Sequence, residues 1–184
     1  MRIGRAWWLP ALFLLATTAA VMAGDFTYTI NPDNTNTITI TGYTGPGGAV
    51  VIPSTLESKT ITRMYCTFLG CTTLTSVTIP NSVTNIGHQT FQNCINLISV
   101  MIPDSVSSIE DFAFSGCSIL IGVTIPDSVS SIGEYAFSSC TNLTSAIIGN
   151  GVTNIGDEAF WDCQSLIGVA IPNSVTRIGE DAFK

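Results

Sequence analysis

The chain has 184 residues, of which 46% are hydrophobic and only 10% are charged, with a formal net charge of −7. Removing residues 1–23 takes away Arg2 and Arg5 and leaves 4 basic residues against 13 acidic ones, a net charge of −9. This balance argues against nucleic acid or an anionic membrane surface as a partner, because both require concentrated Lys and Arg.

Residues 1–23 have the pattern of a secretory signal peptide. A basic start precedes an apolar stretch, and small residues, Val21 and Ala23, occupy the −3 and −1 positions of a cleavage site after Ala23. The 18 residues from Ala6 to Ala23 also leave an uncleaved membrane anchor open. After cleavage we expect no membrane insertion, and a chain that is secreted or held at the cell surface.

Residues 24–49 predict a β-hairpin that caps the first coil of the domain that follows. Aromatic and aliphatic residues alternate with Thr between Phe26 and Ile40, on either side of the turn sequence Asn31-Pro32-Asp33-Asn34. Such a hairpin would cover an otherwise open sheet edge.

A unit of 23 residues is repeated from Leu74 to the last residue. The period is marked by Leu74, Leu97, Leu120, Leu143 and Leu166, by Phe91, Phe114, Phe137, Phe160 and Phe183, and by Cys71, Cys94, Cys117, Cys140 and Cys163. A fixed period in the twenties predicts a solenoid, in which each coil buries its apolar side chains against its neighbours. We expect this solenoid over residues 50–184, with a degenerate first unit at 50–73 and a truncated last unit.

Each unit begins with a short strand. In the first full unit, Val77 and Ile79 alternate with Ser76 and Thr78, and Pro80 ends the strand because it has no amide hydrogen. A second inward pair follows on the opposite, convex wall. The predicted inward positions of this coil are Leu74, Val77, Ile79, Val83, Ile86, Thr90, Phe91 and Cys94.

A turn follows the second inward pair in every unit. Its glycine column, Gly87, Gly133, Gly156 and Gly179, predicts a positive φ angle, with Glu110 as a strained exception. The next column, His88, Asp111, Glu134, Asp157 and Glu180, is expected to begin a short helical turn of the type D-x-A-F. A metal-binding stripe is the weaker interpretation, because one carboxylate per coil lacks convergent oxygens.

The five repeated Cys residues predict buried free thiols and not disulfides. Equivalent Cα atoms of stacked coils lie about 5 Å apart, but parallel side chains do not give the torsion that an S–S bond needs. Cys66 stands outside this register and either pairs with Cys71 or stays free.

The shared pattern L-x-x-V-x-I-P-x-S-V-x-x-I-G-x-x-A-F-x-x-C closely resembles the BspA-like leucine-rich repeat family of bacterial and protist surface proteins. The resemblance covers Leu74 to Lys184, and Val50 to Cys71 as a degenerate unit with a bulged loop expected around Leu56 to Ile61. It implies a leucine-rich repeat solenoid with short parallel strands on the concave side and irregular or short helical turns on the convex side. Known relatives act as secreted or surface adhesins and binding modules, without a fixed interaction motif.

The sequence contains no catalytic constellation. His88 is the single histidine and occupies a column that is otherwise acidic, and the Cys spacing is not that of a metal site, so we expect no enzyme activity, metal or cofactor. A binding module would use the outward strand column: Thr78, Met101, Thr124, Ile147 and Ala170. The expected ligand is an extracellular protein or glycan. The alternative is a spacer, or a fragment of a larger surface protein.

The sequence predicts no capping segment for the final unit. If the chain ends there, Phe183 and the faces of Ile171 and Ile178 are poorly covered. This edge is expected to associate with another copy of the chain.

Overall fold

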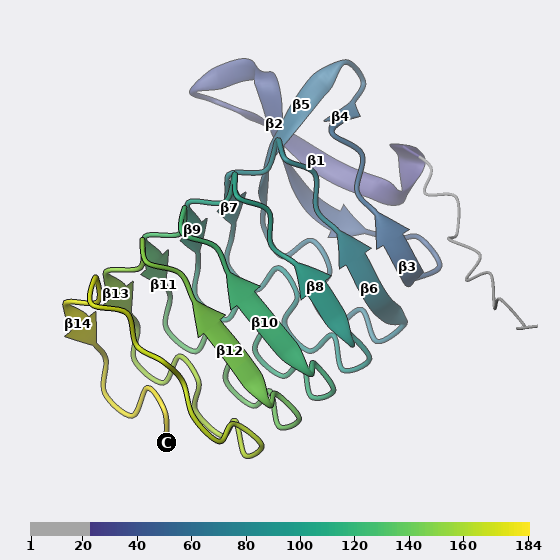
Figure 1. The fold of residues 1–184 in the computed structure, drawn as a ribbon. Coiled ribbons are helices and arrows are strands. Elements are labelled where there is room, and N and C mark those ends of the chain that lie inside the picture. Colours follow the sequence, from purple (N-terminus) through teal and green to yellow (C-terminus); the bar gives the residue numbers. More distant parts are fainter. Residues whose placement is uncertain (1–22) are drawn as a thin grey trace, which may run out of the picture.

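The chain winds into a solenoid whose coils stack side by side (Figure 1). The computed structural model describes residues 23–184, so the predicted signal peptide lies outside the described residues except for Ala23. Equivalent residues of neighbouring coils are paired in parallel, for instance Ile86 with Ile109. The predicted solenoid is confirmed. Among residues 23–184, no helix has the length and apolarity needed to span a membrane.

Short parallel strands form one side of the solenoid, which we call the strand face. They are β3 (Gly48–Val51), β6 (Leu74–Thr78), β8 (Ser99–Met101), β10 (Gly122–Ile125) and β12 (Ser145–Ile148). Strand β6 pairs with β3 and β8, and β10 pairs with β12. Proline follows every one of these strands except β12, as Pro80 and Pro126 do, and limits their length because it donates no hydrogen bond to a ladder.

A second parallel ladder runs along the solenoid. It consists of β5 (Lys59–Met64), β7 (Asn85–Ile86), β9 (Ser108–Ile109), β11 (Ser131–Ile132), β13 (Asn154–Ile155) and β14 (Arg177–Ile178), each paired with the next. The sequence predicted irregular or short helical turns here. Within residues 23–184 the only helical segment is η1 (Ala23–Asp25), a 3-10 turn, so from β7 onward this side consists of turns and two-residue strands.

The segment that follows the glycine column folds as consecutive turns, and the predicted helical turn is not formed. The amide of Cys94 donates to the carbonyl of Phe91 at 3.1 Å, whereas the amide of Phe91 donates to Ala113 of the next coil at 2.7 Å. The carboxylate of Asp111 accepts the amide of Glu134, also in the next coil, at 2.8 Å. Asp111, and likewise Asp157 through the amide of Glu180, thus join neighbouring coils and do not cap a helix.

The explanation given for the glycine column was wrong. Positive φ angles of 51 to 57° occur two residues later, at Gln89, Phe112, Tyr135, Glu158 and Asp181, and at none of the four column glycines. Glycine is needed there for space, since a Cβ on Gly156 would lie 2.6 Å from the amide nitrogen of Glu134. In the exceptional coil, the carboxylate of Glu110 accepts the amide of His88 at 2.9 Å and the side-chain amide of Asn85 at 2.8 Å.

The core is a set of columns that run the length of the solenoid. All eight inward positions predicted for the first full coil are buried. The Phe column forms a continuous stack, with ring centroids 5.0 to 5.3 Å apart, through Phe68, Phe91, Phe114, Phe137, Phe160 and Phe183. One ring per coil therefore contacts the rings before and after it, so burial comes from stacking rather than from any single coil.

The N-terminal strands extend the second ladder. Strands β1 (Phe26–Asn31) and β2 (Asn34–Tyr43) form the predicted antiparallel hairpin, and β2 pairs in parallel with β5. The bulged loop predicted around residues 56–61 is instead a tight hairpin, in which β4 (Thr55–Leu56) turns back onto β5. Its two turn residues, Glu57 and Ser58, have φ angles of 47° and 64°.

The last coil keeps only part of the pattern. Its segment at 166–171, which the repeat predicts as a strand, has no strand pairing, and Ile167 is 97% exposed. Strand β14 still pairs with β13. The strand face therefore ends at β12.

Candidate functional site

The outward residues of the strand face form a single column. The pairing aligns Val51 with Thr78 and Met101, and Thr124 with Ile147. Because side chains alternate along a strand, these residues point away from the core while their neighbours point into it. The exposed fraction is 78% for Met101 and 59% for Ile147, which are large apolar side chains in contact with solvent.

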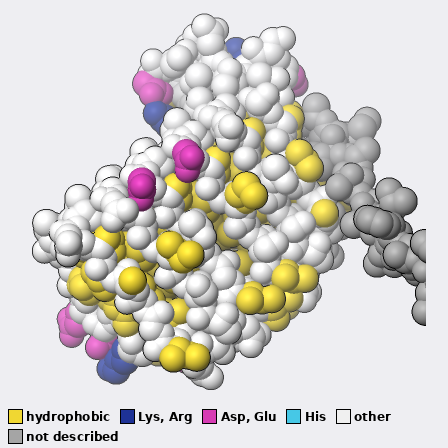
Figure 2. Space-filling view, in the orientation of Figure 1, with side chains coloured by type: hydrophobic (Ala, Val, Ile, Leu, Met, Phe, Trp, Pro, Cys, Tyr) yellow, Lys and Arg dark blue, Asp and Glu magenta, His cyan; other side chains and the backbone are white. Residues whose placement is uncertain are grey.

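A groove of about 690 Å³ crosses the strand face over three neighbouring coils. Of the five predicted contact residues, Met101, Thr124 and Ile147 line it together, whereas Thr78 and Ala170 do not. Thr78 belongs to β6, outside the groove, and Ala170 lies in the last coil, where no strand forms. Figure 2 shows patches of hydrophobic side chains over the strands of this side.

The groove lies where the strand face is interrupted. Strand β8 pairs with β6 and β10 pairs with β12, but β8 and β10 do not pair with each other. Val100 of β8 is only partly buried and lines the groove, while Val77 and Val123 at the same position of the flanking coils are 5% and 4% exposed. Gly122 of β10 adds no side chain to the groove wall.

Two carboxylates stand at one end of the groove. Asp104 and Asp127 follow the prolines that end the strands of their coils, and both side chains are exposed. One oxygen of Asp127 accepts the amide of Asn150 at 2.6 Å. Within residues 23–184, the Asp104 carboxylate has no hydrogen-bond or ion-pair partner. The site therefore combines apolar side chains with uncompensated negative charge.

A stripe of aromatic rings on the turn side was not predicted from the sequence. The ring of Tyr65 stacks on that of His88, His88 packs edge to face on Phe112, and Phe112 stacks on Tyr135. The distances between ring centroids are 6.0, 5.7 and 4.8 Å, respectively. The hydroxyl of Tyr135 donates to Glu158 at 2.6 Å, a hydrogen bond that raises the Tyr135 pKa. The 23- and 24-residue spacing of these rings was a signal that could have revealed the stripe. Since ring faces are covered by other rings, we assign it to coil stacking.

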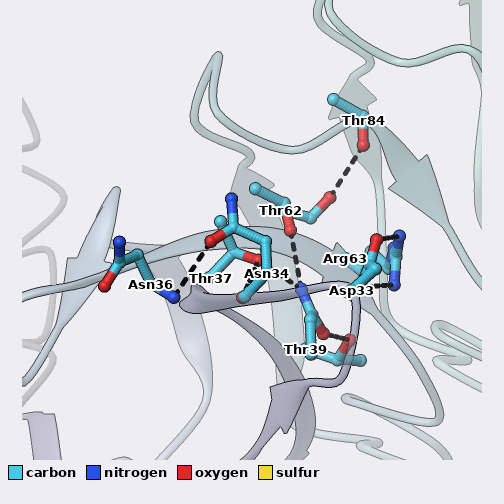
Figure 3. A network of polar contacts seen from close by, with 9 residues as sticks. Asp33, Asn34, Asn36, Thr37, Thr39, Thr62, Arg63 and Thr84 are labelled. Atoms are coloured by element: carbon cyan, nitrogen blue, oxygen red, sulfur yellow. Dashed lines mark hydrogen bonds and ion pairs between the residues drawn. The ribbon is translucent and has the colours of Figure 1, made fainter.

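A network of polar contacts lies among the N-terminal strands (Figure 3). The Arg63 guanidinium binds both carboxylate oxygens of Asp33, at 3.2 and 2.6 Å, and this ion pair lowers the pKa of Asp33. Asn31 is buried, and its side-chain amide donates to the hydroxyls of Thr37 and Thr62. The polar groups of this network bind one another, so it fixes the hairpin against the first coil.

Four of the five thiols of the Cys column hydrogen-bond to the backbone of the preceding coil. All six thiols are free, as predicted for the repeated column, and Cys66 is also unpaired. Each of four thiols donates to the carbonyl of a Phe 26 residues earlier, at 3.1 to 3.3 Å: Cys94, Cys117, Cys140 and Cys163. Burial raises the pKa of Cys94 to about 12. In the described part of the chain, no group of three or more metal-ligating side chains converges.

A second hollow, of about 440 Å³, opens on the last coil. Its lining is mostly apolar and includes Phe160, Leu166, Val169, Ile178 and Phe183. The equivalent positions of earlier coils are covered by the following coil, so this surface has the pattern of an interface between coils. The predicted self-association concerns this surface and stays a prediction.

Comparison with known proteins gives a family and several solved structures. Residues 61–184 match the family described as BspA type leucine rich repeat region, in six copies. A leucine-rich repeat protein of T. pallidum is 36% identical with a TM-score of 0.85, covering 89% of this chain and 77% of that one. No curated protein sequence matches the chain significantly.

Two further solved structures are longer than this chain. A leucine-rich repeat protein of Bacteroides ovatus is 34% identical with a TM-score of 0.74, covering 85% of this chain and 42% of that one. A leucine rich cell surface protein of Faecalibacterium prausnitzii is 32% identical with a TM-score of 0.60, covering 91% and 52%. The chain thus spans about half the length of these two relatives.

Proposed function

The chain belongs to the BspA-type leucine-rich repeat family, and we propose that it is a non-catalytic binding module of the cell surface or the extracellular space. Solved relatives include one named as a cell surface protein, which supports this location. The N-terminal signal pattern supports it as well. A binding site on this module would lie in outward positions, because the inward ones are occupied by stacking between coils.

One observation carries the proposal: the groove on the strand face exposes Met101 and Ile147 on either side of Thr124. Large apolar side chains in an open groove contribute nothing to the core, yet they offer the surface that a protein partner buries on binding. The ligand is an extracellular protein or glycan, without nucleic acid or membrane insertion. In this proposal, Met101, Thr124 and Ile147 contact the ligand, and Thr78 lies beyond one end of the groove.

Binding assays with matched variants test the proposal. The purified chain is applied to immobilised extracellular-matrix proteins, cell-surface glycoproteins and neutral glycans, with Met101→Thr/Ile147→Thr as the test variant. The control is Ile98→Thr/Ile121→Thr, because these side chains are 45% and 55% exposed but lie outside the groove. We expect specific binding that the test variant loses and the control keeps.

Two outcomes contradict the proposal. Equal binding by the parent chain and the test variant would place the contact elsewhere on the molecule. The absence of binding to every immobilised probe would favour a spacer within a longer surface protein, which needs no binding activity.

A further inference from the structure

The basic residues of the described chain are confined to its two ends. No Lys or Arg occurs between Arg63 and Arg177, and Lys59 and Lys184 lie outside that interval. In the view of Figure 2, Lys and Arg likewise appear only near the two ends of the molecule. The same interval contains eight acidic residues: Asp104, Glu110, Asp111, Asp127, Glu134, Asp157, Glu158 and Asp162. The central coils therefore carry a charge of −8 with His88 neutral, and like charges add in the field around the groove.

Among residues 23–184, no basic side chain forms an ion pair with the groove carboxylates. The ion pairs of the described residues join Arg63 to Asp33, Arg177 to Asp157 and Lys184 to Asp181. None of them involves the groove. Asp104 and Asp127 hold equivalent positions in neighbouring coils, and the second ladder pairs these two coils through β9 and β11, so the backbones at the two residues stand about 5 Å apart. Two carboxylates at this spacing repel one another, and a cation placed between them relieves that repulsion.

The apolar part of the groove has a spacing of its own. Met101 and Ile147 belong to strands two coils apart, which places them about 10 Å from each other along the solenoid axis. A polypeptide in the polyproline II conformation advances about 3.1 Å per residue with three residues per turn, so apolar side chains three residues apart lie on one side of it, about 9 Å apart, and would meet both. Thr124 lies between them and adds a hydroxyl that donates or accepts a hydrogen bond.

The lining argues against a glycan in this groove. No Phe, Tyr or Trp is among the residues that line it, so a sugar ring finds no aromatic face to lie on. Sulfated or sialylated glycans are anionic and would be repelled by the acidic central coils. A neutral glycan would leave the groove carboxylates without a counter-charge. A basic polypeptide meets both the charge and the apolar side chains.

We propose that the groove receives an extended basic polypeptide segment in the polyproline II conformation, with two apolar side chains three residues apart on Met101 and Ile147 and a Lys or Arg between Asp104 and Asp127. This inference rests on the proposed binding function and specifies the partner of that same groove. Electrostatic attraction would speed the encounter and fix the orientation of the segment.

Synthetic peptides test the inference directly. Three sets of peptides of about ten residues, long enough to cross three coils, share one scaffold. The first set has two apolar residues three positions apart together with Lys. The second has Glu in place of Lys, and the third keeps Lys but has Ser in place of both apolar residues. A panel of neutral and anionic oligosaccharides is measured beside them. Dissociation constants are determined for the purified chain at about 0.05 M and about 0.5 M salt.

Two double variants separate the charge from the apolar contact. Asp104→Asn/Asp127→Asn removes the groove carboxylates with little change of shape. Its control, Glu134→Gln/Glu180→Gln, removes the same charge from exposed side chains outside the groove. We expect the apolar Lys set to bind best, the aspartate variant to lose about tenfold in affinity, and the glutamate control to lose less than about twofold. High salt should abolish most of that difference.

The outcomes distinguish the inference from the function on which it rests. If binding is lost in Met101→Thr/Ile147→Thr but unchanged in Asp104→Asn/Asp127→Asn, the inference that the partner is basic is overturned, while the groove remains a binding site. The basic partner is likewise overturned if the Glu peptides or an oligosaccharide bind as well as the Lys peptides. Binding that is insensitive to both double variants contradicts the inference and the proposed function together. Absence of binding by every peptide also overturns the inference.

Discussion

Replacement of Gly156 by Ala should destabilise the solenoid through a clash between coils. The amide of Gly156 donates to the carbonyl of Ile132 in the preceding coil at 2.9 Å, which fixes the two backbones close together. An added Cβ would lie 2.6 Å from the amide nitrogen of Glu134 and from the carbonyl carbon of Gly133. Ordinary contacts of this kind are 3.4 to 4 Å. Because the obstructing atoms are backbone, relief requires a shift of the whole coil.

The expected loss is about 2 kcal/mol in the free energy of unfolding, within the range for an overpacked interior. For a domain of this size the melting temperature should fall by about 4 to 8 °C. Gly168→Ala is the matched control, because no atom lies within 4 Å of the Cβ position there. Its change should stay within about 0.5 kcal/mol. Thermal unfolding followed by circular dichroism, with urea titration of the same variants, measures both.

Equal melting temperatures for Gly156→Ala and Gly168→Ala would refute the clash. A third variant, Gly156→Asn, tests the competing explanation from backbone conformation. Asn tolerates a positive φ angle better than Ala, so a φ requirement predicts that Asn is the milder replacement. Crowding predicts that Asn is at least as damaging as Ala, because its side chain is larger. A stability near that of the parent in the Asn variant would show that space is not the limiting factor.

Three further predictions concern the core, the thiols and the last coil. Phe114→Ala should cost about 3 to 5 kcal/mol in urea unfolding, because this fully buried ring stacks at 5.0 Å on both neighbouring rings; a cost below about 1 kcal/mol would contradict the stack. Burial raises the pKa of Cys94 from 9.0 to about 12, so the contribution of this thiol to the free energy of unfolding is complete below pH 9 and falls by about 1.4 kcal/mol per pH unit as the pH rises toward 12. Cys94→Ala should therefore make the loss of unfolding free energy between pH 9 and 12 less steep. An unchanged slope would refute the assignment. Sedimentation velocity should show concentration-dependent self-association that Ile167→Asp abolishes, since Ile167 is exposed at the apolar surface of the last coil; a monomer at all concentrations would exclude it.

The inward columns were predictable because each of them is sampled several times in the sequence. A column such as Phe91 to Phe183 meets the same environment in every coil, so a repeated residue type reports a repeated requirement. The physical nature of the requirement is harder to infer than its location. Glycine serves both left-handed backbone and close backbone approach, and the sequence does not distinguish the two needs at Gly156. The left-handed residues are instead Tyr135 and its equivalents, types that rarely adopt this conformation.

Features that differ from coil to coil were not predictable. The groove lies where β8 and β10 do not pair, and this missing pairing is specific to the packing of these two coils. The repeat predicts a strand at 166–171 just as it does at 74–79, yet only the latter segment forms a strand, β6, which pairs with β8. The sequence therefore identified the outward column but not which members share a groove. Met101, Thr124 and Ile147 do so, and Thr78 and Ala170 do not.

The division between repeating and non-repeating positions also explains where binding is proposed. A repeated residue is accounted for by stacking, as the thiol of Cys117 is by its bond to the carbonyl of Phe91 at 3.2 Å. Met101 and Ile147 occupy an outward column that has Thr in two other coils, at Thr78 and Thr124, and their exposed side chains add little to the stability of the fold. Stacking thus leaves their identity unexplained. Met101, Ile147 and Asp104 line one groove, which is why the proposed binding site is placed there.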